Sequence, residues 1–303
     1  MHAVDDEIVV LCWNVEHNER DRRDPGNARA GMARVEIMAR YGANLVLRQE
    51  LTGAADDGRG PLWMEANALG LFPSLAPATP ESPNPTGVLV CPNTFEIQHE
   101  YEHVTNGWHP ICNPVIKLKG TSKPLSLASL HLCSYDPDTR FGEARRLLFL
   151  AAQGRSALIG GDTNDYPHRP EPVALPDWKL VQDPILYEQR TIWRGSERVS
   201  STEVDRILAG VKPGGHVAYE ELGWYASNKL DLPEALKPTA SLRRTDQGSL
   251  QRIDRMFATP DVARCLISLD VDDSDEVGDV SDHALVAARL SRARLQRALT
   301  LAT

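Results

Sequence analysis

Several short apolar runs of this chain end in polar residues of the kinds that bind metal ions or move protons. Asn14 closes the run at residues 8–14, and Glu50 directly follows the run at residues 45–49. Carboxylate and amide oxygens suit a hard cation such as Mg²⁺, and an imidazole beside a carboxylate suits proton transfer. One such residue alone is typically a turn former or a helix cap. Together they indicate a site that binds a metal or a phosphate, and the other members of the set are His131, Asp162, Asn164, Asp254, Asp282 and His283.

The runs that carry these residues have the length and β-branched composition of buried strands. Apolar residues at helical spacing predict helices at residues 28–41 and 140–152, and the proline-rich stretch 73–85 predicts a surface loop. Helices alternate with strands near both ends of the chain but not in its middle, which favours mixed sheets. Strands are expected at residues 8–14, 45–49, 87–91, 95–99, 114–118, 125–132, 157–160, 252–259 and 284–290.

The domain organisation follows from the length and the lack of a linker. The 303 residues suit one large domain or two ordinary ones, and no clear linker divides them, so we expect a single domain over 1–303. The polar stretch at about 183–250 is interpreted as an insertion or an elaborated loop region, with helix-like segments at 202–209 and 220–226. Its Trp193, Trp224 and Tyr225 could form a stacking platform for an aromatic group or the local core of the insertion, and we favour the second.

The composition excludes several classes of protein. Hydrophobic residues at 42% and charged residues at 25% are values of a globular chain, and the five cysteines, never in a CxxC spacing, argue against a disulfide framework or a structural zinc site. The apolar runs are too short to cross a membrane, and the acidic start of the chain is unlike a secretory signal, so we expect a cytoplasmic protein. The net charge of −9 disfavours a uniformly basic surface for nucleic acid but leaves room for a local basic cleft.

Six motifs of the chain, taken together, are far more specific than any residue alone. They resemble, in order, the motifs of the endonuclease/exonuclease/phosphatase superfamily. This metal-dependent group contains deoxyribonuclease-I-like nucleases, abasic-site endonucleases, tyrosyl-DNA phosphodiesterases, deadenylases, inositol-polyphosphate phosphatases and sphingomyelinases. The resemblance implies a four-layer α/β sandwich, in which two packed mixed β-sheets are flanked by helices and the site lies at one edge. The motifs are LCWNVEHN from Leu11, LVLRQE from Leu45, SLHL from Ser129, IGGDTND from Ile159, RIDRMFATP from Arg252 and VSDHALV from Val280.

The resemblance also assigns a metal site. Glu50, with Asn14 and Asp282, would hold Mg²⁺, with Mn²⁺ as a substitute, because a partly hydrated cation on oxygen ligands leaves room for a substrate phosphate. Glu16 would be a carboxylate just outside the ligands, where many members have Asp. The cation would neutralise the phosphoryl oxygens and stabilise the departing oxygen.

The remaining motif residues match the superfamily's catalytic groups. Asp254 would orient His283 and favour its protonated form, so that the imidazole donates to the phosphate. Asp162 would position or deprotonate the attacking water, and Asn164 and His131 would donate to the phosphoryl oxygen. The implied mechanism is direct in-line attack by water without a covalent intermediate.

Substrate contacts are weaker predictions. Tyr135, Arg140 and Arg252 are candidates for binding the substrate, because guanidinium groups pair with phosphate and an aromatic ring can stack. The acidic residues at 270–282 are expected to form a solvated loop that repels a long polyanion.

Three functions compete at this point. The leading one is a Mg²⁺-dependent phosphodiesterase or nuclease whose partner is a phosphodiester substrate, with nucleic acid among the candidates, and neither a membrane nor a protein partner is indicated. The second is a phosphatase or phosphodiesterase acting on a small phosphorylated metabolite or a lipid head group. The third is a non-catalytic binding protein with the same fold, which we disfavour because none of the catalytic candidates has been lost.

Overall fold

The computed structural model describes residues 6–19, 28–173, 175–244 and 249–300, in which strands alternate with helices except from β3 to β7, where five strands follow one another. The strands are β1 Glu7–Asn14, β2 Leu45–Gln49, β3 Phe72–Ala76, β4 Thr86–Val90, β5 Phe95–His103, β6 Ile111–Leu118, β7 Leu125–His131, β8 Ser156–Asp162, β9 Thr191–Arg194, β10 Glu197–Ser200, β11 Glu220–Glu221, β12 Asp254–Ala258, β13 Leu266–Asp272 and β14 Leu285–Ser291. The α-helices are α1 Ala28–Arg40, α2 Asp56–Leu69, α3 Pro137–Leu147, α4 Pro184–Arg190, α5 Glu203–Ala209, α6 Leu222–Lys229, α7 Pro260–Ala263, α8 Asp275–Val280 and α9 Arg292–Ala298. Short 3₁₀ helices lie at Glu16–Glu19, Leu148–Ala151, Pro213–Gly215 and Pro233–Leu236.

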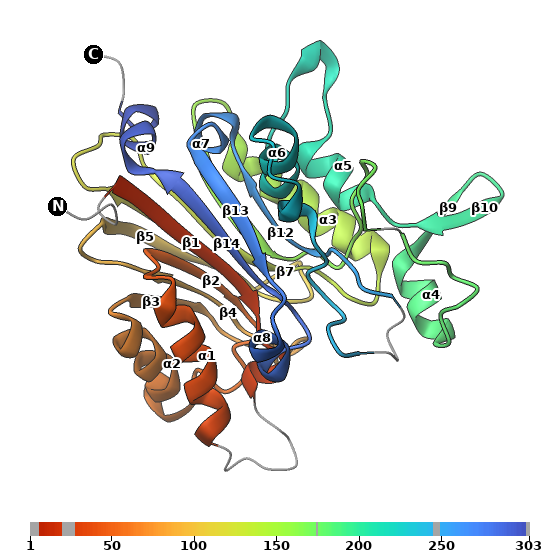
Figure 1. Cartoon of the computed structure of the whole chain (residues 1–303), viewed down its shortest axis with the longest axis horizontal. Helices are drawn as coiled ribbons and strands as arrows, with labels where there is room; N and C mark the ends of the chain where they lie inside the picture. Colours follow the sequence, from red (N-terminus) through yellow and green to blue (C-terminus); the bar gives the residue numbers. More distant parts are fainter. Residues whose placement is uncertain (1–5, 20–27, 174, 245–248, 301–303) are drawn as a thin grey trace.

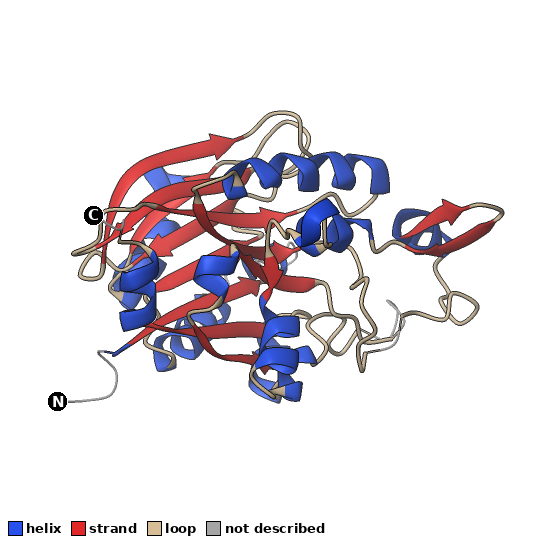
Figure 2. Ribbon diagram, turned by 90° about the horizontal axis from the view of Figure 1, so that it is seen from above, coloured by secondary structure: helices blue, strands red, loops and turns tan. Residues whose placement is uncertain are grey.

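Two six-stranded mixed sheets form the centre of the molecule. The first has the order β13-β14-β1-β2-β4-β3 and the second has the order β11-β12-β8-β7-β6-β5. Each contains one parallel pair, β1 with β2 and β7 with β8, among antiparallel neighbours. Helices cover the outer faces, as Figures 1 and 2 show from two sides. The predicted four-layer α/β sandwich is therefore confirmed.

The central strand β1 is buried on both faces, which explains its unbroken apolar sequence. Ile8, Val10 and Cys12 belong to the core between the two sheets, and the alternate residues of the strand belong to a second core beneath the helices. Side chains of a strand point alternately to opposite faces, so one short run supplies both layers. A third core lies on the outer face of the second sheet, under α3 and α5.

A buried ion-pair cluster fixes the ends of β1 and β2. Arg48 on β2 is fully buried and donates from Nε to Glu65 of α2 at 3.0 Å and from Nη1 to the Trp13 carbonyl at 2.9 Å. Arg34 of α1 donates to the other oxygen of Glu65 at 2.7 Å. Burial alone would raise the pKa of Glu65, but the two guanidinium groups outweigh it and lower the pKa to about 2. The cluster ties two helices to the strand ends from which Asn14 and Glu50 extend.

Of two sequence predictions about loops, the first is wrong at residues 73–76 and the second is wrong over most of its length. The stretch 73–85 contains most of the edge strand β3, in which Pro73 pairs with Leu89 in register; a proline is tolerated on an edge strand because one side of the strand needs no donor. The acidic residues from 270 to 282 lie largely in β13 and α8. Residues from other parts of the chain bind some of these carboxylates. Arg40 forms an ion pair with Glu276, and the Tyr41 hydroxyl donates a hydrogen bond to Asp272.

In the stretch 183–250, the described residues 183–244 and 249–250 hold α4 to α6, two 3₁₀ helices and three short strands. The strands β9 and β10 form a hairpin of their own, which projects from the sandwich beside α4 in Figure 1. The strand β11 pairs with β12 and so joins the edge of the second sheet. Among the described residues no helix combines the length and the apolar character that crossing a membrane requires.

Candidate active site

The strand register brings the predicted residues to one edge of the sandwich. In the second sheet Asp162 at the end of β8 pairs with His131 of β7 on one side and with Asp254 of β12 on the other. In the first sheet Asn14 ends β1 opposite Gln49, the residue before Glu50. Neighbouring strands lie about 4.8 Å apart. Residues paired in this way therefore share one small volume.

Asn14 connects the two sheets at this edge. Its amide nitrogen lies 3.5 Å from Glu50 Oε1 and 3.4 Å from Asp162 Oδ2. Glu50 is also held by the backbone N–H of His17, which donates to Oε2 at 2.9 Å. Glu50 has a positive φ of 52° and Asn164 one of 51°. This left-handed conformation is uncommon for residues with a side chain and is found preferentially at functional sites.

Asp162 lies among positive and proton-donating groups. The Nε2 atom of His131 is 3.6 Å from Asp162 Oδ2 and 4.0 Å from Glu50 Oε1. Burial favours the neutral acid, but His131, His283 and Arg190 outweigh it and lower the pKa of Asp162. Asp162 therefore stays an ionised carboxylate at neutral pH, as a base or an orienting group for water must be.

Asn164 is fixed by both its backbone and its side chain. Its backbone N–H donates to Asp162 Oδ1 at 2.8 Å, and its amide donates to the Leu132 carbonyl, also at 2.8 Å. The amide has a second N–H, because an Asn side chain carries two donors. This remaining donor is the one that could meet a phosphoryl oxygen.

His283 and Asp254 form a buried pair. The Nδ1 atom of His283 lies 2.8 Å from Asp254 Oδ2, and its Nε2 atom lies 3.7 Å from Asp282 Oδ1. Burial disfavours the imidazolium, but Asp254 above all, and then Asp282 and Asp162, raise the pKa of His283 well above its ordinary value. The Trp13 indole donates to the His283 carbonyl at 3.0 Å and so ties this residue to β1. His283 is thus held as a proton donor at neutral pH.

The residues predicted to hold a cation have the right donor atoms for one. Asn14 Oδ1 is buried and has no hydrogen-bond partner among the described residues, a costly state unless a ligand meets it. Burial raises the pKa of Glu16, and the nearby carboxylates of Asp282 and Glu50 raise it further, so negative charge converges here. Arg244 bridges Glu16 and Asp282, at 3.3 Å and 3.5 Å. A set of oxygen ligands with excess negative charge fits Mg²⁺.

A second group of atoms that could bind a metal ion lies at the same edge of the sandwich, on the strands of the second sheet and beside them. Atoms of Asp162, Asp254 and His283 lie within 4.8 Å of one another. Because Asp254 Oδ2 and His283 Nδ1 form a hydrogen bond of 2.8 Å, we assign this group to proton chemistry and the Asn14–Glu50 pair to the cation.

Two predicted substrate contacts have structural partners instead. Arg140 is fully buried, and its guanidinium donates to the carbonyls of Cys133 at 2.5 Å and Gln189 at 2.9 Å. Arg252 is buried between Glu171 at 3.0 Å and Glu221 at 2.7 Å. Neither guanidinium is available to a phosphate, so both assignments are corrected to a role in packing. Tyr135 is 43% exposed and so remains accessible to a ligand.

Three residues near the site escaped the sequence analysis. The His109 ring stacks on the His131 ring at 3.9 Å between centroids, and Ser82 is hydrogen-bonded to it at 2.5 Å. Arg190, at the end of α4, has buried Nε and Nη1 atoms with no hydrogen-bond partner among the described residues. These residues lie on loops or at the end of a helix in the 183–250 stretch, outside the recognised motifs. No local pattern marks them, because only the fold brings them to the sheet edge.

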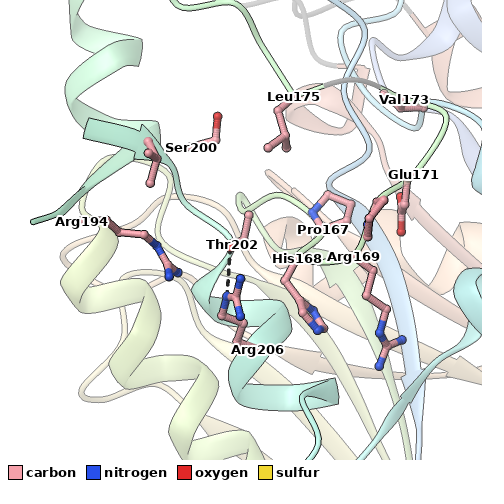
Figure 3. Close-up of a pocket in the computed structure, with 12 residues that line it drawn as sticks. Pro167, His168, Arg169, Glu171, Val173, Leu175, Arg194, Ser200, Thr202 and Arg206 are labelled. Carbon is pink, nitrogen blue, oxygen red and sulfur yellow. Dashed lines mark hydrogen bonds between the residues drawn. The ribbon is translucent and has the colours of Figure 1, made fainter. Parts of the chain in front are cut away.

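A separate cavity of about 430 Å³ lies between residues 167–175 and the segment from β9 to α5 (Figure 3). Arg194 and Arg206 line it together with His168. Their charge is partly neutralised, since Arg194 pairs with Glu203 at 3.2 Å. We call the residues gathered at the edge of the sandwich the sheet-edge cluster, and they are Asn14, Glu50, His131, Asp162, Asn164, Asp254, Asp282 and His283. None of the residues that line the cavity belongs to this cluster, so the cavity and the candidate active site lie at different places.

Comparisons with known proteins identify the fold through solved structures alone. No family model matches the chain, and no curated protein is significantly similar to it in sequence. Solved structures do match. A structure of D. rerio TDP2 complexed with single strand DNA product has a TM-score of 0.62 at 14% identity, covering 93% of this chain and 98% of that one.

Two further matches are of the same quality. An endonuclease/exonuclease/phosphatase from Bacteroides vulgatus gives a TM-score of 0.64 at 13% identity, over 94% of this chain and 98% of that one. The human Nocturnin catalytic domain with bound sulfate anion gives 0.59 at 13% identity, over 95% and 94%. The chain therefore has the fold of the endonuclease/exonuclease/phosphatase superfamily, as its motifs predict.

The His283–Asp254 pair generates a prediction about pH. Replacing Asp254 with Asn removes the charge that most raises the pKa of His283, so this pKa should fall and the imidazolium should be lost at a lower pH. We expect the alkaline limb of the kcat/KM profile of Asp254→Asn to move to lower pH by about one unit or more. Measured profiles that superimpose on those of the parent protein would contradict the assignment of His283 as the charged donor.

Proposed function

We propose that this protein is a Mg²⁺-dependent phosphoesterase that hydrolyses phosphodiester bonds by direct attack of water, and that nucleic acid is its substrate class. The observation that carries the proposal is the sheet-edge cluster, in which Asp162 lies between His131 and Asp254 while Asn14 and Glu50 approach it from the other sheet. The fold supports the reaction class but does not by itself fix it, because one fold hosts several functions.

Each residue of the cluster has a separate role in the proposed hydrolysis. Asp162, kept ionised by its cationic neighbours, orients the attacking water and accepts its proton. His283, kept protonated by Asp254, donates to the phosphate, and Asn164 and His131 donate to phosphoryl oxygens that gain charge in the transition state. Water is the nucleophile, so no protein side chain becomes covalently modified.

Glu50 and Asn14, with Asp282, would hold the cation, and Glu16 would lie just outside these ligands. When bound, Mg²⁺, or Mn²⁺ in its place, neutralises phosphoryl oxygens and stabilises the departing oxygen. The buried Oδ1 of Asn14, which has no hydrogen-bond partner in the described part of the chain, supports this placement.

Nucleic acid is favoured as the substrate class by two kinds of observation. One protein of the same fold, TDP2, is described with a single strand DNA product, and another, Nocturnin, is described with a sulfate anion, which has the shape and charge of a phosphate group. Within this chain, Arg190 offers a guanidinium whose buried Nε and Nη1 atoms have no hydrogen-bond partner among the described residues and whose charge lowers the pKa of Asp162. We assign it to a phosphate oxygen of the substrate. A cytoplasmic location remains part of the proposal.

The experiment that tests the function is product release from a panel of substrates, with Mg²⁺ or with EDTA. The panel holds single- and double-stranded DNA, RNA, bis-p-nitrophenyl phosphate and sugar phosphates. We expect diesters to be cleaved only with the metal, and Glu50→Gln to need a higher Mg²⁺ concentration for half-maximal rate. Activity on monoesters alone would favour the small-metabolite phosphatase, and no activity on any ester would favour a binding protein.

Arg190 gives a matched pair of variants. Arg190→Gln should lower kcat/KM for a diester by about 10- to 100-fold, because a charge-assisted hydrogen bond to the phosphate is lost. Arg190→Lys should recover part of the rate, since it keeps the charge but not the paired donors. Arg194→Gln is the control, because this arginine is exposed and pairs with Glu203; its rate should stay within about twofold. Equal losses in Arg190→Gln and Arg194→Gln would refute the assignment.

A further inference from the structure

Four aromatic rings form a continuous series from the sheet-edge cluster to the surface. His131 stacks on His109 with ring centroids 3.9 Å apart and an interplanar angle of 17°. The His109 ring is 6.2 Å from that of Trp108, and the Trp108 ring is 4.5 Å from that of Tyr135 in an edge-to-face contact. The inner ring reaches Asp162 and the outer one is 43% exposed. The series therefore connects the catalytic candidates directly with solvent.

Both loops that carry the outer rings are anchored. Glu143 of α3 is buried, and its two carboxylate oxygens accept the backbone N–H of Trp108 at 2.6 Å and of Cys133 at 2.8 Å. Arg146 of the same helix donates to the carbonyls of Thr105 at 2.9 Å and Asn106 at 2.7 Å. One helix thus fixes the loop before β6 and the loop after β7 relative to each other. A binding surface whose parts are held in advance loses little entropy when a ligand binds.

Trp108 and Tyr135 differ from the exposed aromatic residues elsewhere on the molecule because their rings continue the series that begins at His131. Trp193 is 67% exposed on the β9–β10 hairpin, where Arg198 lies over its ring at 5.5 Å. Phe149 is 66% exposed beside Arg155. Neither has a ring contact with the cluster in the described structure, whereas Trp108 is the sequence neighbour of the ring that stacks on His131.

We propose that Trp108 and Tyr135 form a subsite for a planar aromatic group, a nucleobase, carried by the phosphate that binds at the sheet-edge cluster. This inference rests on the proposed function and narrows it. A substrate held by His131 through its phosphate places its attached group along the ring series, and a base can stack on such rings whatever its identity. The subsite favours nucleotide substrates over sugar phosphates and lipid head groups.

The test compares a nucleotide with the same sugar phosphate lacking the base. Adenosine 5′-monophosphate and ribose 5-phosphate are titrated into the intact chain with Mg²⁺ by isothermal calorimetry, a readout that needs no turnover. We expect the nucleotide to bind about 5- to 100-fold more tightly, the range expected for stacking one base. Trp108→Ala and Tyr135→Ala should each reduce this ratio towards one and leave the affinity for ribose 5-phosphate unchanged.

Three variants complete the design. Trp108→Phe keeps a ring and should retain most of the preference, and Trp193→Ala, a tryptophan outside the series, should retain all of it. Tyr135→Ala tests the subsite from the second loop in case Trp108→Ala fails to fold.

Three results would overturn the subsite, and a fourth would overturn the phosphate site itself. The first is equal binding of the two ligands by the parent protein, and the second is an equal loss of both ligands in Trp108→Ala, which would mean that Trp108 only supports His131. The third is a lost preference in Trp193→Ala. Binding of neither ligand would overturn the phosphate site, and with it the proposed function.

Discussion

The register of three strands in the second sheet is the constraint on which the site depends. Because β7, β8 and β12 pair with His131, Asp162 and Asp254 opposite one another, their side chains reach the same edge together. Side chains alternate between the faces of a sheet, so a slip of one residue in either pairing would turn one group away from the others. The buried cluster of Arg48 and Glu65 fixes the opposing edge of the first sheet, from which Asn14 and Glu50 extend.

Charge balance explains how so many ionisable groups can lie together away from water. Asp162 and Asp254 are nearly inaccessible, and a buried carboxylate is tolerated when cations or donors meet it. For Asp162, Arg190 and the imidazolium of His283 supply that positive charge, and the backbone N–H of Asn164 donates to it. The backbone adds to the arrangement, since Glu50 adopts the left-handed conformation. Such local strain persists only where the surrounding fold enforces it.

The sequence predicted the features that depend on neighbouring residues, and it did not predict those that depend on contacts between distant parts of the chain. Apolar runs predicted most strands of both sheets, and the polar residues that end them predicted the cluster, because strand ends gather at a sheet edge. Arginines were misjudged. Arg140 and Arg252 were predicted to bind the substrate, yet each is buried with partners distant in sequence. Trp108 and His109 were missed because their contacts join separate loops. Helix α2 was missed as well: Pro61 lies inside it, and its first turn has non-helical backbone angles.

The most direct test of the account is single-turnover hydrolysis of a diester by the parent protein and by Asp162→Asn, with Mg²⁺ and excess protein. Asn keeps the size of Asp162 but can neither accept the proton of water nor balance the neighbouring cations. The account predicts a rate at least about a hundredfold lower in the variant, with its unfolding transition showing that the fold is intact. A variant that cleaves the diester at nearly the parental rate would contradict the central role of the sheet-edge cluster.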